Sequence, residues 1–503
     1  MTHPFQEPEH FGAAPPTEWH LLPFSHIDLD AGREVLVNVC GEYVIAPRGT
    51  TGSLVRRQLE PRSDLYRNLR AKHFLYDERS SPLMDILATK YRTKKAFLEG
   101  FTKLHIFVVT LRCEHTCSYC QVSRQSSDRD RFDMSQETAD RALDLMFRSR
   151  AQNLTLELQG GEPLLNFSLI RYIVDRARNR ATNERRGLNI AITTNLALAT
   201  DEILNYCREE RLLLSTSLDG PSFIHDAHRR RPGNNSHALV VDRVRRARDI
   251  VGPDNISALM TTTRMSMDHA TAIIDEYVHL GFRSVFLRPL SPYGFAVRSA
   301  AKTGYHTEEY LEFYRTGLAH ILDLNRRGVE LSEVYATTIL RKILTPFPTY
   351  YVDLQTPPGV GIGVVVYNYD GDVYASDEGR MLAEMGDTSF RIGNVHRDTY
   401  DQIFGSAYLK GMIREATAES VPGCSECAFL PYCGSDPVYN YRTQGDIVGH
   451  RPTSGFCRRN MEIIRLLFRL LADGGPDIER IFYSWIRGRS IRPEANEHVD
   501  HAA

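Results

Sequence analysis

The chain has 503 residues, of which 42% are hydrophobic, and this is enough for two to four domains with sizeable buried cores. Its 61 Lys and Arg residues nearly balance 63 Asp and Glu residues, so the net charge of -2 excludes a general attraction to nucleic acid or to an anionic membrane. The N-terminus lacks an apolar signal region and no run approaches a membrane-spanning length, so we expect a cytoplasmic protein.

Both ends of the chain have the polar composition of flexible tails. A small domain follows the N-terminal tail. Residues 1–18 and 486–503 are rich in polar residues, and we expect both to be flexible. Within the domain predicted over residues 19–95, the run 33–47 reads as two strands joined at a glycine turn. Helical patterns over 50–59 and 63–75 complete a strand-strand-helix-helix unit.

Residues 100–330 alternate short apolar runs with amphipathic helical sequence, which predicts an α/β domain with a parallel sheet. Ser135 is a predicted N-cap, and Gly281 is a predicted helix terminator. Periodicity leaves open whether the βα units form a partial barrel or an open sheet. The six apolar runs are 104–111, 154–159, 188–194, 212–218, 256–263 and 284–290.

Residues 345–472 have a different character. Asp370-Gly371 lies between two β-rich stretches and predicts a hairpin, which a loop-rich segment with several cysteines follows. The helical pattern 456–475 is expected to close the ordered part of the chain.

Three cysteines lie close together at the predicted end of the strand 104–111, where α/β folds place their active sites. These are Cys113, Cys117 and Cys120, among only nine cysteines in the chain. No fourth ligand lies nearby in the sequence, and three ligands leave one coordination position open for chemistry. The alternative is that three buried thiols simply fill space, but clustered cysteines in an intracellular protein favour metal or redox chemistry.

The stretch "CEHTCSYC" resembles the CxxxCxxC loop of radical S-adenosylmethionine (SAM) enzymes, including the aromatic Tyr119 before the last cysteine. "LQGGEPLLN" resembles the GGEP motif of that family. The resemblance implies a partial (βα)6 barrel and a [4Fe-4S] cluster on the three cysteines. It also implies that Gly160, Gly161 and Glu162 hold the methionine amine of SAM.

Three later strand ends resemble family positions that bind the ribose and carboxylate of SAM. They carry Asn195, Ser217 and Arg229, with Asp219 two residues after Ser217. Each also has an ordinary structural interpretation: a helix cap, a turn at Asp219-Gly220-Pro221, or a solvated arginine loop. We interpret His225 and His228 as structural.

A second set of cysteines provides four thiols in loop-rich sequence, a number that suits either zinc or an iron-sulfur cluster. The spacing resembles the core of the SPASM extension of peptide-modifying radical SAM enzymes. Ser376 and Pro437 stand where that pattern has further cysteines, so the resemblance implies one auxiliary [4Fe-4S] cluster in place of two. Of the remaining cysteines, Cys207 is expected in the core and Cys40 is unassigned. The ligand set is Cys424, Cys427, Cys433 and Cys457.

The N-terminal unit resembles a winged-helix peptide-recognition domain, and nearly the whole chain resembles the radical SAM maturase of the His-Xaa-Ser peptide system. The resemblance implies reductive cleavage of SAM to a 5′-deoxyadenosyl radical, which oxidatively crosslinks a ribosomally made precursor peptide that can contain His-Xaa-Ser repeats. It implies an electron donor such as flavodoxin or ferredoxin, and no nucleic-acid or membrane partner.

Asp377 and Glu378 are candidate bases on position alone, or they only cap the hairpin. One alternative function is a protein maturase that forms formylglycine or a thioether. The other is a non-catalytic zinc-binding peptide adapter.

Overall fold

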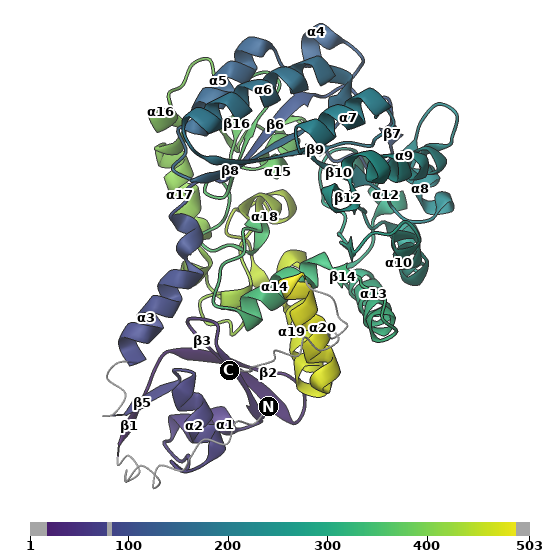
Figure 1. Cartoon of the computed structure of the whole chain (residues 1–503). Coiled ribbons are helices and arrows are strands. Elements are labelled where there is room, and N and C mark those ends of the chain that lie inside the picture. The colour runs from purple at the N-terminus through teal and green to yellow at the C-terminus, as the bar shows by residue number, and fades with distance from the viewer. Residues whose placement is uncertain (1–17, 78–82, 489–503) are drawn as a thin grey trace, which may run out of the picture.

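The centre of the molecule is one mixed sheet of eight strands in the order β12-β10-β9-β8-β6-β15-β16-β17 (Figure 1). The computed structural model describes residues 18–77 and 83–488. Five parallel core strands are β6 (Leu104–Thr110), β8 (Asn153–Gly160), β9 (Gly187–Thr193), β10 (Leu213–Ser217) and β12 (Ile256–Leu259). The other three are β15 (Val364–Tyr367), β16 (Asp372–Tyr374) and β17 (Arg391–Asn394).

The core strands are held in register by a row of apolar side chains. Phe107 of β6 lies opposite Leu158 of β8, and Leu158 lies opposite Ile192 of β9. All three side chains are fully buried, as expected for a parallel sheet covered by helices. The helices α5, α6 and α7 lie along one side of the sheet (Figure 1). The core helices are α5 (Gln136–Phe147), α6 (Phe167–Asn183), α7 (Asp201–Glu209), α8 (Ser222–His228), α9 (Ser236–Val251), α10 (Ala270–His279) and α13 (Thr307–Arg326).

The α/β class and the partial barrel with a parallel sheet are confirmed, with one change in the strands. The sixth predicted run forms only the short strand β13 (Ser284–Val285), which pairs with β14 (Ser332–Glu333) outside the main sheet. Pro289, which has no N–H to donate, lies in the part of that run that leaves the strand. Instead β15 supplies the sixth parallel strand, paired to β6 through Val366 and Ile106.

Local sequence signals set several element ends as predicted. Ser135 Oγ accepts a hydrogen bond of 3.0 Å from Thr138 N at the start of α5. Gly281, with φ of +75°, follows the end of α10, and Gly371, with φ of +88°, makes the turn between β15 and β16. Both glycines hold the left-handed conformation that favours this residue.

The N-terminal unit contains an antiparallel sheet in the order β2-β3-β4, followed by helices. The predicted strands and helices between residues 33 and 75 form, but the sequence pattern missed three short strands. The strands are β1 (Trp19–Leu21), β2 (Phe24–Asp28), β3 (Arg33–Asn38), β4 (Tyr43–Pro47) and β5 (Leu75–Asp77). The helices are α1 (Thr50–Val55), α2 (Asp64–Ala71) and α3 (Leu83–Lys94).

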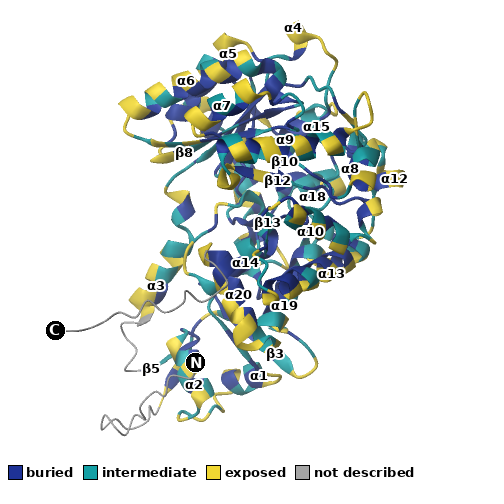
Figure 2. Ribbon diagram, turned by 45° about the vertical axis from the view of Figure 1, so that its right-hand side comes forward, coloured by how far each residue is buried: buried dark blue, intermediate teal, exposed yellow. Residues whose placement is uncertain are grey.

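The C-terminal third packs between this unit and the sheet. Tyr432 Oη donates a hydrogen bond of 2.9 Å to Gly41 O, and the rings of Tyr43 and Phe468 meet edge to face. Figure 2 shows buried residues on α19 and α20 and a largely exposed α3. The helices are α14 (Val334–Leu344), α15 (Asp377–Ala383), α16 (Tyr400–Phe404), α17 (Ala407–Ala416), α18 (Pro437–Gln444), α19 (Gly455–Asp473) and α20 (Gly475–Arg487).

Helix α20 corrects the prediction that the ordered part ends with the helix 456–475 and that a tail starts at 486. Pro476 stands in the first turn of α20, a position that suits proline. Phe482 and Trp485 are buried, and Trp485 Nε1 donates to Asn325 Oδ1 at 2.9 Å. The predicted tails otherwise lie outside the described residues. Among the residues that are described, no helix combines the length and apolar character needed to span a membrane.

Candidate functional site

The loop that follows β6 carries the three close cysteines, and other segments hold its backbone in place. Within it, β7 (Thr116–Cys117) pairs with β11 (Arg229–Arg230), so Cys117 lies opposite Arg229. Ser118 N donates to His228 O at 2.9 Å, and Phe295 N donates to Cys120 O at 2.7 Å. The loop is therefore fixed by two parts of the chain more than a hundred residues away.

The three cysteines line one cavity of about 160 Å³. Burial, with the nearby charges of Glu114 and Glu162, raises the pKa of the Cys113 thiol. Burial also raises the pKa of Cys117, although the guanidinium of Arg229 opposes it. Six of the seven residues predicted to bind SAM line the same cavity. They are Tyr119, Gly160, Gly161, Asn195, Ser217 and Arg229.

Several polar atoms around this cavity have no partner within the described part of the chain. Gln121 Nε2, Arg124 Nε and Gln159 Nε2 are buried without a hydrogen bond, and all three residues line the cavity. Buried polar groups are normally hydrogen-bonded. These donors are therefore suited to a polar ligand, and the cavity fits a cofactor with several acceptor atoms.

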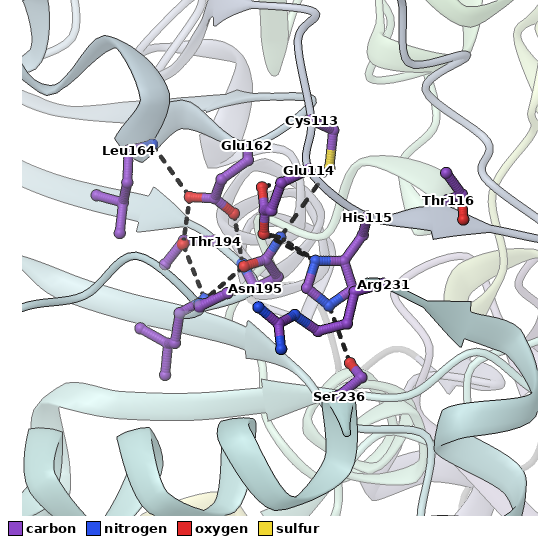
Figure 3. Close-up of polar contacts among 12 residues, drawn as sticks. Cys113, Glu114, His115, Thr116, Glu162, Leu164, Thr194, Asn195, Arg231 and Ser236 are labelled. Atoms are coloured by element: carbon purple, nitrogen blue, oxygen red, sulfur yellow. Dashed lines mark hydrogen bonds and ion pairs between the residues drawn. The ribbon is translucent and has the colours of Figure 1, made fainter. Parts of the chain in front are cut away.

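Glu162 is the one predicted SAM residue that does not line the cavity. Its carboxylate accepts hydrogen bonds from Leu164 N at 3.0 Å, Thr194 Oγ1 at 2.6 Å and Asn195 N at 2.8 Å (Figure 3). Burial, with the nearby Glu114, raises the pKa of Glu162 to about 8. In this structure the side chain ties the end of β8 to the end of β9.

The two glycines before Glu162 have a packing role that the sequence motif did not reveal. A Cβ atom on Gly160 would lie 1.9 Å from Thr110 O, and one on Gly161 would lie 2.2 Å from Arg112 O. Gly161 N donates to Thr110 O at 2.8 Å. The glycines therefore let β8 approach the backbone that leads into the cysteine loop.

His115, which lines the cavity next to Cys113, belongs to a network of hydrogen bonds (Figure 3). His115 Nδ1 lies 2.8 Å from Glu114 Oε1, and its Nε2 lies 2.9 Å from Ser236 Oγ. Asn195 Nδ2 also donates to Glu114 Oε1 at 2.8 Å. Although burial opposes it, these hydrogen bonds hold the pKa of Glu114 below its ordinary value. Both ring nitrogens of His115 are thus engaged by protein groups, so the imidazole has no free nitrogen to offer a ligand in the cavity.

Asp219 connects two of the predicted SAM residues. Arg229 Nε donates to Asp219 Oδ2 at 3.0 Å, and Tyr119 Oη donates to the same oxygen. The guanidinium of Arg229 also lies over the Tyr119 ring, 5.4 Å from its centre. Burial raises the pKa of Asp219, but Arg229 and its other neighbours hold it below its ordinary value. The sequence had singled out Asp219 beside Ser217 at this strand end, with a turn as the ordinary interpretation, but its contacts with Arg229 and Tyr119 were not predicted.

Helix α15 closes over the cysteine loop from the C-terminal third. Arg380 is fully buried, donates to Val122 O at 3.1 Å and pairs with Asp377 at 2.9 Å. The candidate base Asp377 is thus held by an arginine. The other candidate base, Glu378, lines a different cavity, described below. Sequence reasoning missed Arg380, which has no motif of its own.

The second cysteine set gathers at one place. Cys424 and Cys427 lie in the loop before Cys433, and Cys457 lies in the first turn of α19. Burial and the neighbouring thiols raise the pKa of Cys427 to about 12 and of Cys457 to about 11. All nine cysteines are free thiols. Over the described ranges, no three His, Cys, Asp or Glu side chains are arranged to hold a single metal ion.

Residues 107–280, which include the cysteine loop and the glycine motif, match the family model described as the Radical SAM superfamily. An uncharacterized protein of Methanocaldococcus jannaschii is 29% identical over 189 residues, which are 37% of this chain and 62% of that protein. The radical SAM cyclopropyl synthase TigE of Paramaledivibacter caminithermalis is 27% identical over 131 residues, 24% of this chain and 27% of TigE. The chain covers less than two thirds of the length of each relative.

Two solved structures share the fold. The structure of anSMEcpe with bound AdoMet and a Cp18Cys peptide has a TM-score of 0.61 at 16% identity, and covers 75% of this chain and 99% of that chain. Streptococcus suis SuiB bound to its precursor peptide SuiA has a TM-score of 0.50 at 12% identity, and covers 87% of this chain and 100% of that chain. The three cysteines, the glycine motif and the partial barrel agree with the family match, so residues 107–280 resemble a radical SAM domain.

Proposed function

We propose that this protein reductively cleaves SAM and uses the resulting radical to modify a ribosomally made precursor peptide oxidatively, by forming a crosslink. The observation that carries the proposal is the composition of one cavity. Three cysteines without a fourth protein ligand share its wall with the glycine motif, Asn195, Ser217 and Arg229. An open metal position beside polar groups is what a SAM-binding cluster requires.

In this proposal Cys113, Cys117 and Cys120 hold the SAM-binding [4Fe-4S] cluster. Cys424, Cys427, Cys433 and Cys457 hold a single auxiliary cluster. When bound, the first cluster and SAM supply the one-electron cleavage that yields a 5′-deoxyadenosyl radical. The protein then has to bind, orient and shield the reactants.

The cavity residues divide this work by their chemistry. Asn195 and Ser217 present polar groups to the ribose, and Arg229 presents a guanidinium to the carboxylate of SAM. Asp219 fixes the orientation of Arg229 and Tyr119 together, because both donate to one of its oxygens. A buried, paired arginine is already oriented before the ligand arrives, which lowers the entropic cost of binding.

The N-terminal unit supports a peptide as the substrate. Strand β2 lies at the edge of its sheet and can accept an added strand from an extended peptide. A cavity of about 340 Å³ lies beside it, lined by Phe24 and Val39 on one side and by Cys427 of the auxiliary set on the other. The names of two structures with this fold include a bound peptide, for anSMEcpe and for SuiB.

Of the two candidate bases, Glu378 is better placed to accept a proton from a substrate. Asp377 is paired with Arg380, whereas Glu378 faces a cavity, where burial and three neighbouring carboxylates raise its pKa. A raised carboxyl pKa brings a base closer to neutral operating pH. The proposed crosslink would give one hydrogen atom to the 5′-deoxyadenosyl radical and one electron to the auxiliary cluster, so the remaining proton needs an acceptor.

Anaerobic reconstitution tests the enzyme against a zinc-binding adapter. The enzyme should bind about eight irons per chain if both cysteine sets hold four-iron clusters, and it should convert SAM to methionine and 5′-deoxyadenosine under reduction by a flavodoxin or ferredoxin system. A colourless protein that holds zinc and leaves SAM intact would overturn the proposal.

Co-expression with a small neighbouring reading frame rich in His-Xaa-Ser repeats tests the substrate. A crosslink removes two hydrogens and suppresses fragment ions between the joined residues. A formylglycine product would instead react with hydrazine reagents, and a thioether would consume a cysteine of the peptide. An unchanged peptide mass would exclude this substrate.

A further inference from the structure

Next to the cysteine cavity lies a second, strongly polar cavity, of which the proposed reaction uses only Glu378. Its volume is about 50 Å³, room for a few waters or for the end of one side chain. Arg288 lines both cavities, so the two are neighbours. Residues far apart in the sequence meet here, from the loop after β13, a single 3-10 turn before β15, α15, α18 and α19.

Five charged side chains line this second cavity, and their opposite charges act on one another without a close ion pair. Three are acidic, namely Asp353, Glu378 and Asp436, and two are basic, namely Arg288 and Arg459. Within the described residues, no ion pair of 4.0 Å or less joins either guanidinium to any of the three carboxylates. Buried charges normally carry close partners. An interior cluster that leaves them apart is suited to a charged ligand.

A neutral group in the same wall points to a ligand independently. Tyr293 is 1% exposed, lines the cavity, and its hydroxyl has no hydrogen-bond partner among the described residues. Burial, with the nearby charges of Asp436, Glu378 and Asp353, raises the pKa of Tyr293 well above its ordinary value. By contrast, Tyr310 Oη already donates to Leu287 O, and Tyr335 Oη to Asn460 Oδ1.

We propose that this cavity, defined by Asp353, Glu378, Asp436, Arg288 and Tyr293, binds a cationic side chain of the peptide substrate. The proposal rests on the proposed peptide-modifying function. When all three carboxyl groups are ionised, the wall carries one more negative charge than positive charges, and a single ammonium, guanidinium or imidazolium group balances it. The volume admits the end of such a side chain, and its neighbour across Arg288 is the SAM cavity.

The raised pKa values of the carboxyl groups also favour a cation at this place. Burial is the largest cause that raises the pKa of Glu378 and of Asp436, and the charge of Asp353 comes next for both. Asp377 also raises the pKa of Glu378, while Arg459 lowers that of Asp436. A positive group among the carboxylates relieves their mutual repulsion.

The test measures which side-chain charge the reconstituted enzyme prefers in the presence of SAM. Ligand-observed NMR titrations use Nα-acetyl-arginine methylamide and its neutral isostere, Nα-acetyl-citrulline methylamide. The lysine, histidine and glutamate methylamides complete the series. We expect at least one cationic probe to bind about tenfold more tightly than citrulline, as for a buried charge-assisted contact.

The variants Asp436→Asn and Glu378→Gln should each remove most of that preference. Asparagine is as good an N-cap as aspartate, so Asp436→Asn keeps the cap on α18, where Asp436 Oδ1 accepts from Tyr439 N at 2.9 Å. Glu415→Gln on the exposed part of α17 is the matched control and should keep the preference. Circular dichroism and iron content check that each variant is folded and loaded.

Equal binding of arginine and citrulline probes, tighter binding of the glutamate probe, or no binding of any probe would each overturn the proposal. If both variants keep the preference for cations, the cation binds at another site, and this result would also overturn the proposal. Cleavage of SAM without peptide, measured on the same preparation, distinguishes a failure of the second-cavity proposal from a failure of the proposed function. If SAM is cleaved and no cation preference is found, only the second cavity is misassigned; if SAM is not cleaved, the proposed function fails.

Discussion

Arg380 of α15 donates a hydrogen bond of 3.1 Å to the carbonyl oxygen of Val122, two residues after the last cysteine of the three-cysteine loop. The two residues are 258 positions apart in the sequence, and the arginine is fully buried. This contact means that the C-terminal third, which carries the second cysteine set, also shapes the first one.

Replacing Arg380 by methionine should therefore loosen the cysteine loop. The substitution leaves Asp377 partly buried without its partner, which costs about 3–5 kcal/mol of unfolding free energy. We expect lower iron content at the first site, measured after reconstitution, and a lower denaturation midpoint. Arg380→Lys keeps the charge but not the planar fork, so its loss should be smaller. Unchanged iron content in Arg380→Met would show that α15 does not support the loop.

Gly160→Ala and Gly161→Ala should each destabilise the protein, because their added methyl groups would lie 1.9 Å and 2.2 Å from backbone oxygens of Thr110 and Arg112. Backbone cannot move aside as a flexible side chain can, and we expect a loss of at least about 3 kcal/mol in urea denaturation. The matched control is Gly411→Ala within α17, where the nearest atom lies 4.0 Å away. That change should be neutral or stabilising by about 0.5–1 kcal/mol. Equal effects at the three positions would contradict the close approach.

Asp219→Asn tests how Arg229 is oriented. The change keeps the shape of the side chain but leaves the buried guanidinium without its carboxylate, at a cost of about 3–5 kcal/mol. In SAM cleavage assays without peptide, we expect a higher KM for SAM, because Arg229 and Tyr119 lose their shared acceptor. Glu276→Gln, which removes the partner of His237 away from the cavity, serves as the control. If the KM for SAM equals that of the parent protein, Asp219 does not contribute to SAM binding.

The second cavity predicts a dependence of stability on pH. Burial raises the pKa of Glu378 and Asp436 above the ordinary values of 4.5 and 3.8, so the native state binds protons more strongly than the unfolded state. Stability from these groups is fully present below the ordinary values and is lost as the pH rises through the raised ones. Thermal denaturation from about pH 5 to about pH 9 should therefore show a falling midpoint in the parent protein.

In Glu378→Gln and Asp436→Asn that fall should be shallower, since each variant removes one group that has to ionise inside the protein. Glu415→Gln, whose parent side chain is exposed, should follow the parent curve. A slope that the two cavity variants leave unchanged would mean that other groups control the pH dependence.

The parallel sheet, the cysteine loop and most of the lining of the three-cysteine cavity could be predicted from the sequence because each signal is local. Apolar runs such as 104–111 mark strands, and CxxxCxxC places three thiols in one loop. Strand β15 was missed as a member of the main sheet, since its parallel pairing to β6 joins segments about 260 residues apart. The hydrogen-bond partners of Glu162 could not be predicted for a similar reason, since Thr194 and Asn195 lie at the end of the next strand.

The second cavity could not be predicted from the sequence. Asp353, Glu378 and Asp436 belong to no motif and lie in three separate elements, and Tyr293 sits in a loop without regular structure. Only the tertiary fold brings them together. The sequence had nonetheless singled out Glu378, from its position beside Ser376 where a cysteine of the related pattern is absent.

The central claim is tested most directly by electron paramagnetic resonance of the reduced protein in which Cys424, Cys427, Cys433 and Cys457 are all replaced by alanine. This variant leaves Cys113, Cys117 and Cys120 as the only cluster ligands. The account predicts the signal of one reduced [4Fe-4S] cluster and a clear change in that signal when SAM is added, because SAM occupies the open iron. A cluster signal that SAM leaves unchanged would contradict it.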